Sequence, residues 1–412
     1  MLVLGNPPWV TNAMLSSLDS DNLPAKSNFK KHSGFDAMTG KGNFDIGEYI
    51  SLMLVKAFHH QQGHIAFLVK NSVLKNLVFD QKQNQYKLSR IEKYSIDAQK
   101  EFGAAVGASL FFAQFGSGKC FECFEYDFYR PGAGVKSKFG WVDENFVSDI
   151  DAYAGNSKID GKCPFEWRQG VKHDCSKIME LERQNDIFIN GGKEEIRLEN
   201  ELVYGLLKSS DLKENVVRES RKAVIITQRR IGQSTRYIKD QFPHTWQYLG
   251  KNRMAFDSRK SSIYKGKPPF SIFGIGDYSF APFKVAISGM YKTWHFTFVY
   301  LENGKPLMLD DTCYFLGFEQ EADAIITFAL LNSERVGNFL KSIVFQDSKR
   351  MITKEVLMRI DLLAVASFFD YHRICIELEK YPQLNYDKIG PQKWEDYVGL
   401  ITPAETTQLS MF

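Results

Sequence analysis

Cysteine is scarce in this sequence, and long apolar runs are missing from it. Six scattered cysteines in 412 residues are too few for the disulfide framework of a secreted protein. Cys120 and Cys123 have metal-like spacing, but no second pair or histidine lies near them, so we expect no metal site. No run approaches the roughly 18 apolar residues that span a bilayer, and Pro7 and Pro8 interrupt the only apolar start that could serve a signal peptide. These absences predict a cytoplasmic protein with free thiols and no membrane partner.

Charge is also nearly balanced, at +3 overall, which by itself indicates no class of partner. The 44% of hydrophobic and 25% of charged residues are typical of a globular protein. The length allows two or three domains, each with its own core. Aromatic residues reach 14%, enough to serve both cores and a site that stacks on flat ligands.

The first ten residues, MLVLGNPPWV, combine a short strand at 2–4 with a rigid loop. Two consecutive prolines end a strand and fix the backbone after Asn6. The Asn6 side chain and the Pro7 carbonyl then present two hydrogen-bond acceptors, which suit an exocyclic NH2 group. Trp9 supplies a flat face for the ring that bears the amine. An adenine extruded from a duplex meets this description, while a purely structural turn after an edge strand is the alternative.

The residues after this loop follow the order of an α/β sheet. Apolar residues recur at helical spacing over 45–61, and strands are predicted at 65–69 and 91–97. The runs SLFFAQF and CFECFEYDFY are predicted to form a strand pair joined by a turn at 116–118. This order predicts half of a doubly wound sheet, in which ligands bind beyond the carboxyl ends of the strands.

The segment Asn6-Pro7-Pro8-Trp9 resembles the Asn-Pro-Pro-aromatic catalytic motif of the N6-adenine DNA methyltransferases. NFDIGEYISLMLVKAF, GHIAFLVKNSVLKN and QKEFGAAVGASLFFAQF follow it in the order of the gamma class of that family. The resemblance covers residues 1–130 well and continues loosely into the recognition domains of restriction-modification methylases. It implies that this motif forms the catalytic loop and that Trp9 and Phe102 stack on a flipped adenine. A core aromatic is the alternative for Phe102.

The resemblance also implies S-adenosylmethionine as cofactor. The family holds it with a glycine-rich turn and an acidic residue that, in the gamma class, precede the catalytic motif, whereas five residues precede Asn6 here. The glycine-rich stretches TGKGNF, FGAAVGAS, FGSGKC and FGIGDYSF lack the strand-turn-helix context of such a site. We therefore expect the cofactor-binding half to be largely absent from this chain and supplied from upstream or by a separate subunit.

Positive charge is concentrated between residues 208 and 267. This window holds 15 Lys and Arg against five acidic residues, a net charge of +10, so the remaining residues sum to −7. Phosphate binding requires this kind of asymmetry, although a solvated basic face is the alternative. Gln228 is a further candidate that could reach adenine. The predicted DNA contacts are Lys208, Arg229, Arg230, Gln233, Arg236, Lys260, Lys265 and Lys267.

The sequence thus predicts a partial doubly wound, Rossmann-like methyltransferase sheet at 1–130, a linker or insert at 131–199, and a mixed α+β target-recognition domain at 200–412. The predicted function is site-specific, adenine-N6 methylation of double-stranded DNA in a restriction-modification or phage-defence system, with a separate cofactor-binding or restriction subunit as a further partner. Two alternatives stay open. One is a DNA-binding specificity subunit without catalysis. The other is a protein glutamine methyltransferase, which shares the Asn-Pro-Pro-aromatic motif because the amide nitrogen of its glutamine substrate is planar like the adenine amine.

Overall fold

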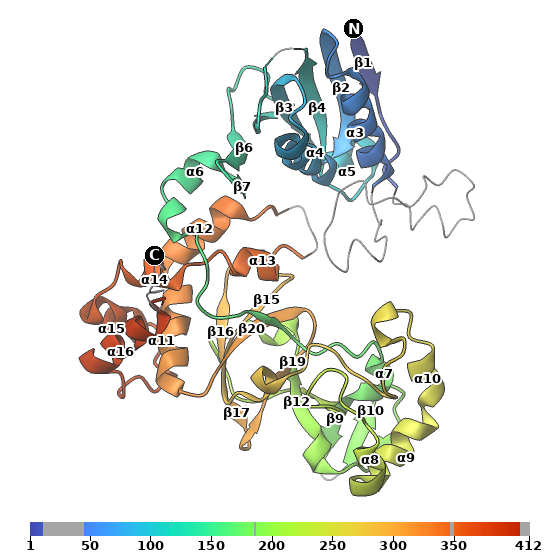
Figure 1. Cartoon of the computed structure of the whole chain (residues 1–412), viewed down its shortest axis with the longest axis vertical. Helices are drawn as coiled ribbons and strands as arrows, with labels where there is room; N and C mark the ends of the chain where they lie inside the picture. The colour runs from blue at the N-terminus through green and yellow to red at the C-terminus, as the bar shows by residue number, and fades with distance from the viewer. Residues whose placement is uncertain (11–44, 117, 185–186, 347–349, 404–412) are drawn as a thin grey trace, which may run out of the picture. The chain divides into compact units, whose positions relative to one another are not determined.

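A computed structural model describes residues 1–10, 45–116, 118–184, 187–346 and 350–403 of the chain (Figure 1). The chain folds into two compact units. Unit 1 consists of Met1–Gly155 with Lys341–Ser348, and unit 2 consists of Asn156–Leu340 with Lys349–Phe412. None of the described helices combines the length and the apolar character that a membrane crossing requires.

Unit 1 is built on a seven-stranded mixed sheet with the strand order β1-β2-β4-β3-β5-β6-β7. Its strands are β1 (Leu2–Gly5), β2 (Gly63–Lys70), β3 (Leu88–Ile96), β4 (Ala108–Phe115), β5 (Glu122–Asp127), β6 (Ser137–Val142) and β7 (Asn145–Val147). β1 pairs with β2 in parallel, whereas β4 is antiparallel to both β2 and β3. The strands β1, β2 and β3 therefore run in one direction, and their carboxyl ends lie at the same edge of the sheet.

Two helices, α3 (Ile46–Phe58) and α4 (Asn71–Asn84), pack on one face of this sheet, and α5 (Ala98–Phe102) and α6 (Ile150–Ala154) are shorter (Figure 1). Successive strand residues point to opposite faces, so Ile65, Phe67 and Phe111 share the buried core with α3 and α4 while Phe112 on the other face is half-buried. The predicted helix over 45–61 is confirmed as α3, and the predicted strands at 65–69 and 91–97 correspond to β2 and β3, except that Asp97 caps α5.

The edge strand β1 is paired on one side only. Among the described residues no strand pairs with its second edge. Val3 packs against the core, but Leu2 and Leu4 on the opposite face are 60% and 67% exposed. An open edge with exposed leucines is a site for further strand pairing.

One predicted pairing is wrong. The runs SLFFAQF and CFECFEYDFY do not form a hairpin, because β4 lies between β2 and β3 and β5 pairs with β3 in parallel. After β4, the chain bonds to the start of β3: Gly116 N donates to Lys87 O at 3.0 Å and Cys120 N donates to Leu88 O at 2.6 Å. These two bonds place Gly116 and Cys120 beside the start of β3.

The segment 131–199 is also not a linker. Its first part belongs to unit 1, where β6 and β7 extend the sheet, and its residues from Asn156 onward belong to unit 2. Its strands are two to six residues long, too short for their alternation to appear as a period. They nevertheless help to bury large side chains such as Phe139 and Trp167.

Unit 2 contains two larger sheets, with the orders β11-β10-β9-β14-β12-β19 and β13-β16-β15-β20-β8, and the small pair β17-β18. Its strands are β8 (Arg168–Gln169), β9 (Glu180–Gln184), β10 (Ile187–Asn190), β11 (Glu195–Ile196), β12 (Val203–Leu207), β13 (Val216–Val217), β14 (Lys222–Ile225), β15 (Phe283–Ser288), β16 (Phe296–Val299), β17 (Leu301–Glu302), β18 (Lys305–Pro306), β19 (Met308–Leu309) and β20 (Cys313–Phe318).

The helices that begin in unit 2 are α7 (Ser176–Met179), α8 (Tyr237–Gln241), α9 (Pro243–Lys251), α10 (Arg253–Asp257), α11 (Glu321–Leu331), α12 (Glu334–Ile343), α13 (Lys354–Leu357), α14 (Leu362–Ala366), α15 (Tyr371–Glu379) and α16 (Pro391–Ile401). Helix α11 lies along β15 and β16 (Figure 1). The predicted strands AVIIT and KVAISGMY correspond to β14 and β15, and the predicted helical region over 321–344 is confirmed as α11 and α12.

Candidate active site and nucleic-acid interface

The loop Asn6-Pro7-Pro8-Trp9 leaves β1 at the carboxyl edge of the unit 1 sheet. Asn6 and Pro8 are exposed, Pro7 is buried and Trp9 is half-buried. Each proline fixes its own φ and restricts the residue before it. Asn6 is therefore exposed on a backbone that has little conformational freedom.

Trp9 is anchored to the neighbouring strand. Its indole Nε1–H donates a hydrogen bond to the Leu68 carbonyl oxygen in β2, at 3.2 Å. A partly buried indole N–H needs such a partner. The bond fixes the Trp9 ring beside the carboxyl end of β2.

Phe102 lies against Trp9, with ring centroids 5.8 Å apart and planes at 83°. Phe102 ends the short helix α5, which follows β3; Asp97 caps the start of α5, and Gly103 ends it with a φ of 65°. Phe102 is 52% exposed. The structure thus brings together the two residues that the sequence predicts to stack on a base. Because their planes are nearly perpendicular, a flat ring can stack on only one of them in this arrangement.

Asp45 and Lys70 support this loop, and sequence reasoning missed both. Asp45 Oδ1 accepts the Gly47 N–H at 2.9 Å and caps α3, while Asp45 Oδ2 pairs with Lys70 Nζ at 2.6 Å. Ile46 N donates to the Val10 carbonyl at 2.9 Å, which ties the start of α3 to the end of the loop. An aspartate directly before a helical period is a visible cap signal in the sequence, whereas its salt bridge is not.

In unit 2, the loop of residues 228–233 carries several of the predicted DNA contacts. Gln233 Oε1 accepts the backbone N–H of Arg229 at 2.7 Å and of Arg230 at 3.3 Å. Gln228 is fully buried: its Oε1 accepts from Ile272 N at 2.9 Å, and its Nε2 donates to the Gln233 carbonyl. Gln228 is therefore a structural anchor and is not placed to contact DNA.

The basic side chains around this loop differ in their surroundings. The Arg229 guanidinium lies 3.9 Å from the Phe280 ring centroid, and Arg230 pairs with Asp277 at 2.9 Å. Lys208 is half-buried and pairs with the buried Glu180 at 2.6 Å. Four exposed residues among the predicted DNA contacts make no salt bridge in the described part of the chain: Arg236, Lys260, Lys265 and Lys267.

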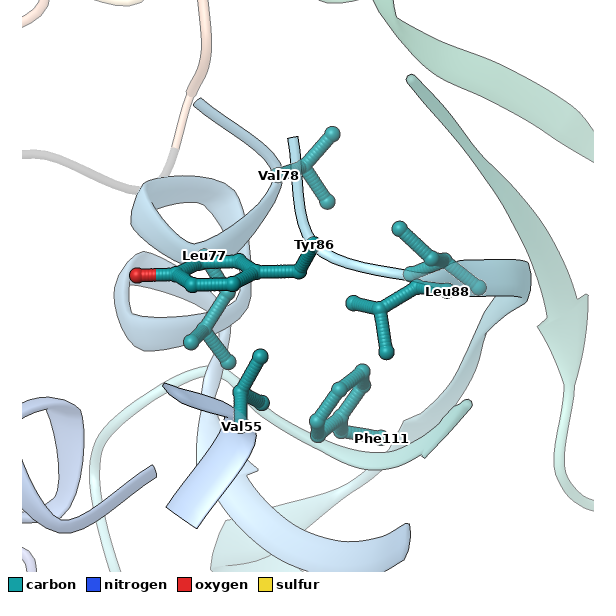
Figure 2. Close-up of a pocket in the computed structure, with 7 residues that line it drawn as sticks. Val55, Leu77, Val78, Tyr86, Leu88 and Phe111 are labelled. Atoms are coloured by element: carbon teal, nitrogen blue, oxygen red, sulfur yellow. The ribbon is translucent and has the colours of Figure 1, made fainter. Parts of the chain in front are cut away.

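A small cavity lies in the core of unit 1 (Figure 2). Its volume is about 10 Å³, and it is lined by Val55, Leu77, Val78, Tyr86, Leu88, Ile91 and Phe111. This space is close to that of a single water, and its walls are apolar apart from the tyrosine hydroxyl. It is a packing void and not a ligand site.

No protein-family model matches the chain. The chain is 40% identical over 371 residues to the Type II methyltransferase M.NspV of Nostoc sp.. This alignment covers 89% of this chain and 76% of that protein. It resembles the solved structure of the Type IIL restriction-modification enzyme MmeI in complex with DNA, with a TM-score of 0.51 and 12% identity. That match covers 97% of this chain, which spans about half, 53%, of the MmeI chain. The likeness to MmeI concerns the fold.

Proposed function

The chain belongs to the family of Type II methyltransferases, and from that premise we propose that it binds duplex DNA and methylates the N6 amine of adenine in a restriction-modification system. One observation carries the proposal: the Trp9 and Phe102 rings meet at the sheet edge where Asn6 is exposed. Aromatic faces beside a rigid carboxamide suit a base that has been extruded from its duplex. In this proposal β1, α3 and β2 belong to the later half of a Rossmann-like, gamma-class methyltransferase sheet.

Asn6 and Pro7 act on the target amine. The Asn6 carboxamide oxygen and the Pro7 carbonyl oxygen each accept one hydrogen of the planar NH2 group. Two such bonds draw the nitrogen toward tetrahedral geometry, so its lone pair becomes available for attack. The stiff backbone holds both acceptors in place before the base arrives, which lowers the entropic cost of binding.

The methyl donor in this proposal is S-adenosylmethionine, which supplies an electrophilic methyl group when it is bound. The described residues do not fit its nucleoside half. The turn from β2 into α4 is Lys70-Asn71 without glycine, and Asp45 near that edge is already paired with Lys70. We therefore assign the donor site to parts of the enzyme outside the described residues. The open edge of β1 supports additional strands there.

Unit 2 binds the duplex in this proposal. The charge asymmetry of residues 208–267 supports it, together with the exposed cations Arg236, Lys260, Lys265 and Lys267. Arg229 and Gln233 are held by contacts within the unit and can contact bases or phosphates, as Arg230 can. These residues favour DNA over a protein glutamine as the substrate.

The purified chain, incubated with bacterial genomic DNA and S-adenosylmethionine, tests the function. A second arm uses a chimera that adds the quarter of the Nostoc relative that the chain does not cover. Hydrolysis of the DNA to nucleosides and mass spectrometry should reveal N6-methyladenine. Asn6→Ala should lower turnover about 100-fold or more and leave DNA binding unchanged, because the lost bond acts mainly in the transition state. Asn84→Ala, at the distant end of α4, is the matched control.

The contrasting variant is Trp9→Ala, which should weaken capture of the base by about 1–3 kcal/mol. Methylcytosine in place of methyladenine would overturn the adenine assignment. Methyl transfer to protein would favour the glutamine methyltransferase. DNA binding without methylation in either arm would identify the chain as a DNA-binding specificity subunit without catalysis. Wild-type turnover by Asn6→Ala would show that Asn6 has no catalytic role.

A further inference from the structure

Ile231 lies at the tip of the 228–233 loop and is 51% exposed. Its neighbours along the chain are Arg230 and Gly232, which has a φ of 82°. Within the described residues, no hydrophobic cluster of unit 2 includes the Ile231 side chain. An apolar side chain is thus exposed in the middle of the most basic window of the chain.

The loop is held rigidly by its own hydrogen bonds. Gln233 bonds through its side chain to the N–H groups of Arg229 and Arg230, and Gln233 N donates to the Arg230 carbonyl at 3.1 Å. The buried Gln228 amide closes the loop through the Gln233 carbonyl. Because the backbone is fixed in this way, the exposure of Ile231 is a property of the fold.

The two arginines beside Ile231 are held as well. Arg229 is stacked on Phe280, an arrangement that leaves the guanidinium edge free to donate hydrogen bonds. Arg230 pairs with Asp277, and both side chains of this pair are largely exposed, at 75% and 66%. A surface ion pair of this kind is weak and exchanges readily for a phosphate.

Single exposed apolar residues are common, and Met254 in α10 is even more exposed, at 86%. Ile231 differs from Met254 because it lies at the tip of a hydrogen-bonded loop and follows two consecutive arginines. Proteins that deform DNA use this combination: an apolar side chain enters a base step while arginines bind the backbone beside it.

We propose that Ile231 is an apolar wedge that inserts between base pairs of the duplex, with Arg229 and Arg230 on the adjacent backbone. The proposal rests on the proposed function, in which unit 2 binds DNA. In this proposal the 228–233 loop separates two stacked base pairs in addition to contacting phosphates. A duplex with a gap in its stack should then bind more tightly, because the wedge fills the gap without separating stacked bases.

Fluorescence anisotropy with two labelled duplexes of one sequence tests this, since one duplex is intact and the other carries a single abasic residue. The full chain should bind the abasic duplex about 10-fold more tightly, a difference of the size expected for partial burial of one isoleucine. Ile231→Ala should abolish the preference, whereas Met254→Ala should keep it. The salt dependence of Ile231→Ala should match that of the wild type, because no charge is removed.

The outcomes separate the two proposals. Equal binding of both duplexes by the wild type, or a preference that survives in Ile231→Ala, would overturn the wedge and leave the proposed function standing. Absence of any DNA binding by the wild-type chain would overturn the proposed function together with the wedge.

Discussion

Lys284 has surroundings that are unusual for a lysine, because its side chain is buried. It lies in β15, the central strand of the five-stranded sheet of unit 2, with 1% of its surface exposed. Its Nζ donates to the Ala281 carbonyl at 2.8 Å, and burial lowers the pKa of its ammonium group to about 7. In the sequence it is an ordinary lysine at the start of KVAISGMY, so nothing in the pattern separates it from a surface residue.

This lysine should make stability depend on pH. An unfolded lysine titrates near pH 10.4, so between about pH 7 and pH 10 the unfolded state binds more protons and the free energy of unfolding rises with pH. Below pH 7 the full cost of burying the charge is present, and above pH 10 it is gone. Lys284→Met should therefore stabilise the protein by a few kcal/mol at pH 6 and much less at pH 10.

Urea unfolding of both proteins across this pH range measures the effect. Lys260→Met removes an exposed lysine and should leave the pH profile unchanged. Parallel profiles for the wild type and Lys284→Met would show that the buried ammonium group does not titrate in this range.

The residues of the candidate active site were more accessible to sequence reasoning. Two prolines after an asparagine indicate a rigid loop, and the loop is where the structure places an exposed Asn6. The family resemblance implied that Trp9 and Phe102 both stack on one base, and the structure brings their ring centroids within 5.8 Å of each other. Their edge-on orientation could not be predicted, because it depends on the Leu68 carbonyl that holds the indole and on where α5 ends.

At the scale of elements, the start of α3 depends on Asp45. Its carboxylate both caps the helix and pairs with Lys70, and the two side chains are only 10% and 18% exposed. The helical period over 45–61 predicted α3, but the salt bridge joins residues 25 positions apart and has no local signature. The pairing of β5 with β3 was missed for a similar reason, since it depends on which strand the chain meets after the glycine turn.

Asp45→Ala should cost about 3 kcal/mol of unfolding free energy, because it removes a cap and leaves the Lys70 charge buried without its partner. Asp149→Ala is the matched control: Asp149 caps α6 and forms no salt bridge with any residue in the described ranges. It should cost about 1 kcal/mol.

Chemical denaturation of both variants provides the comparison. The double variant Asp45→Ala/Lys70→Met should recover part of the loss, because no unpaired charge remains. Equal costs for the two aspartate variants would mean that the pair with Lys70 contributes nothing beyond the cap.

At the scale of the whole molecule, charge is distributed unevenly, and this was read directly from the sequence. The sequence could not show which basic side chains already form salt bridges within the protein. Lys208 is paired with buried Glu180, whereas Lys260, Lys265 and Lys267 are exposed. Domain limits were also misplaced, because the short strands of residues 131–199 belong partly to each unit.

Replacing Lys260, Lys265 and Lys267 together by alanine should reduce the slope of log affinity for duplex DNA against log salt by about three, if each contacts a phosphate. The triple variant Lys380→Ala/Lys388→Ala/Lys393→Ala removes the same charge from the C-cap of α15, from α16 and from the segment between them, and should change the slope little. Titrations at several salt concentrations measure both. The same slope in both triple variants would place the DNA elsewhere on the molecule.

The open edge of β1 has a consequence for the loop that follows it. β1 has four residues, is hydrogen-bonded to β2 alone among the strands described, and leads directly into Asn6. A strand added to that edge would immobilise the same backbone that presents the Asn6 carboxamide. Under the proposed function, completing the sheet would therefore hold the Asn6 carboxamide more rigidly for the target amine.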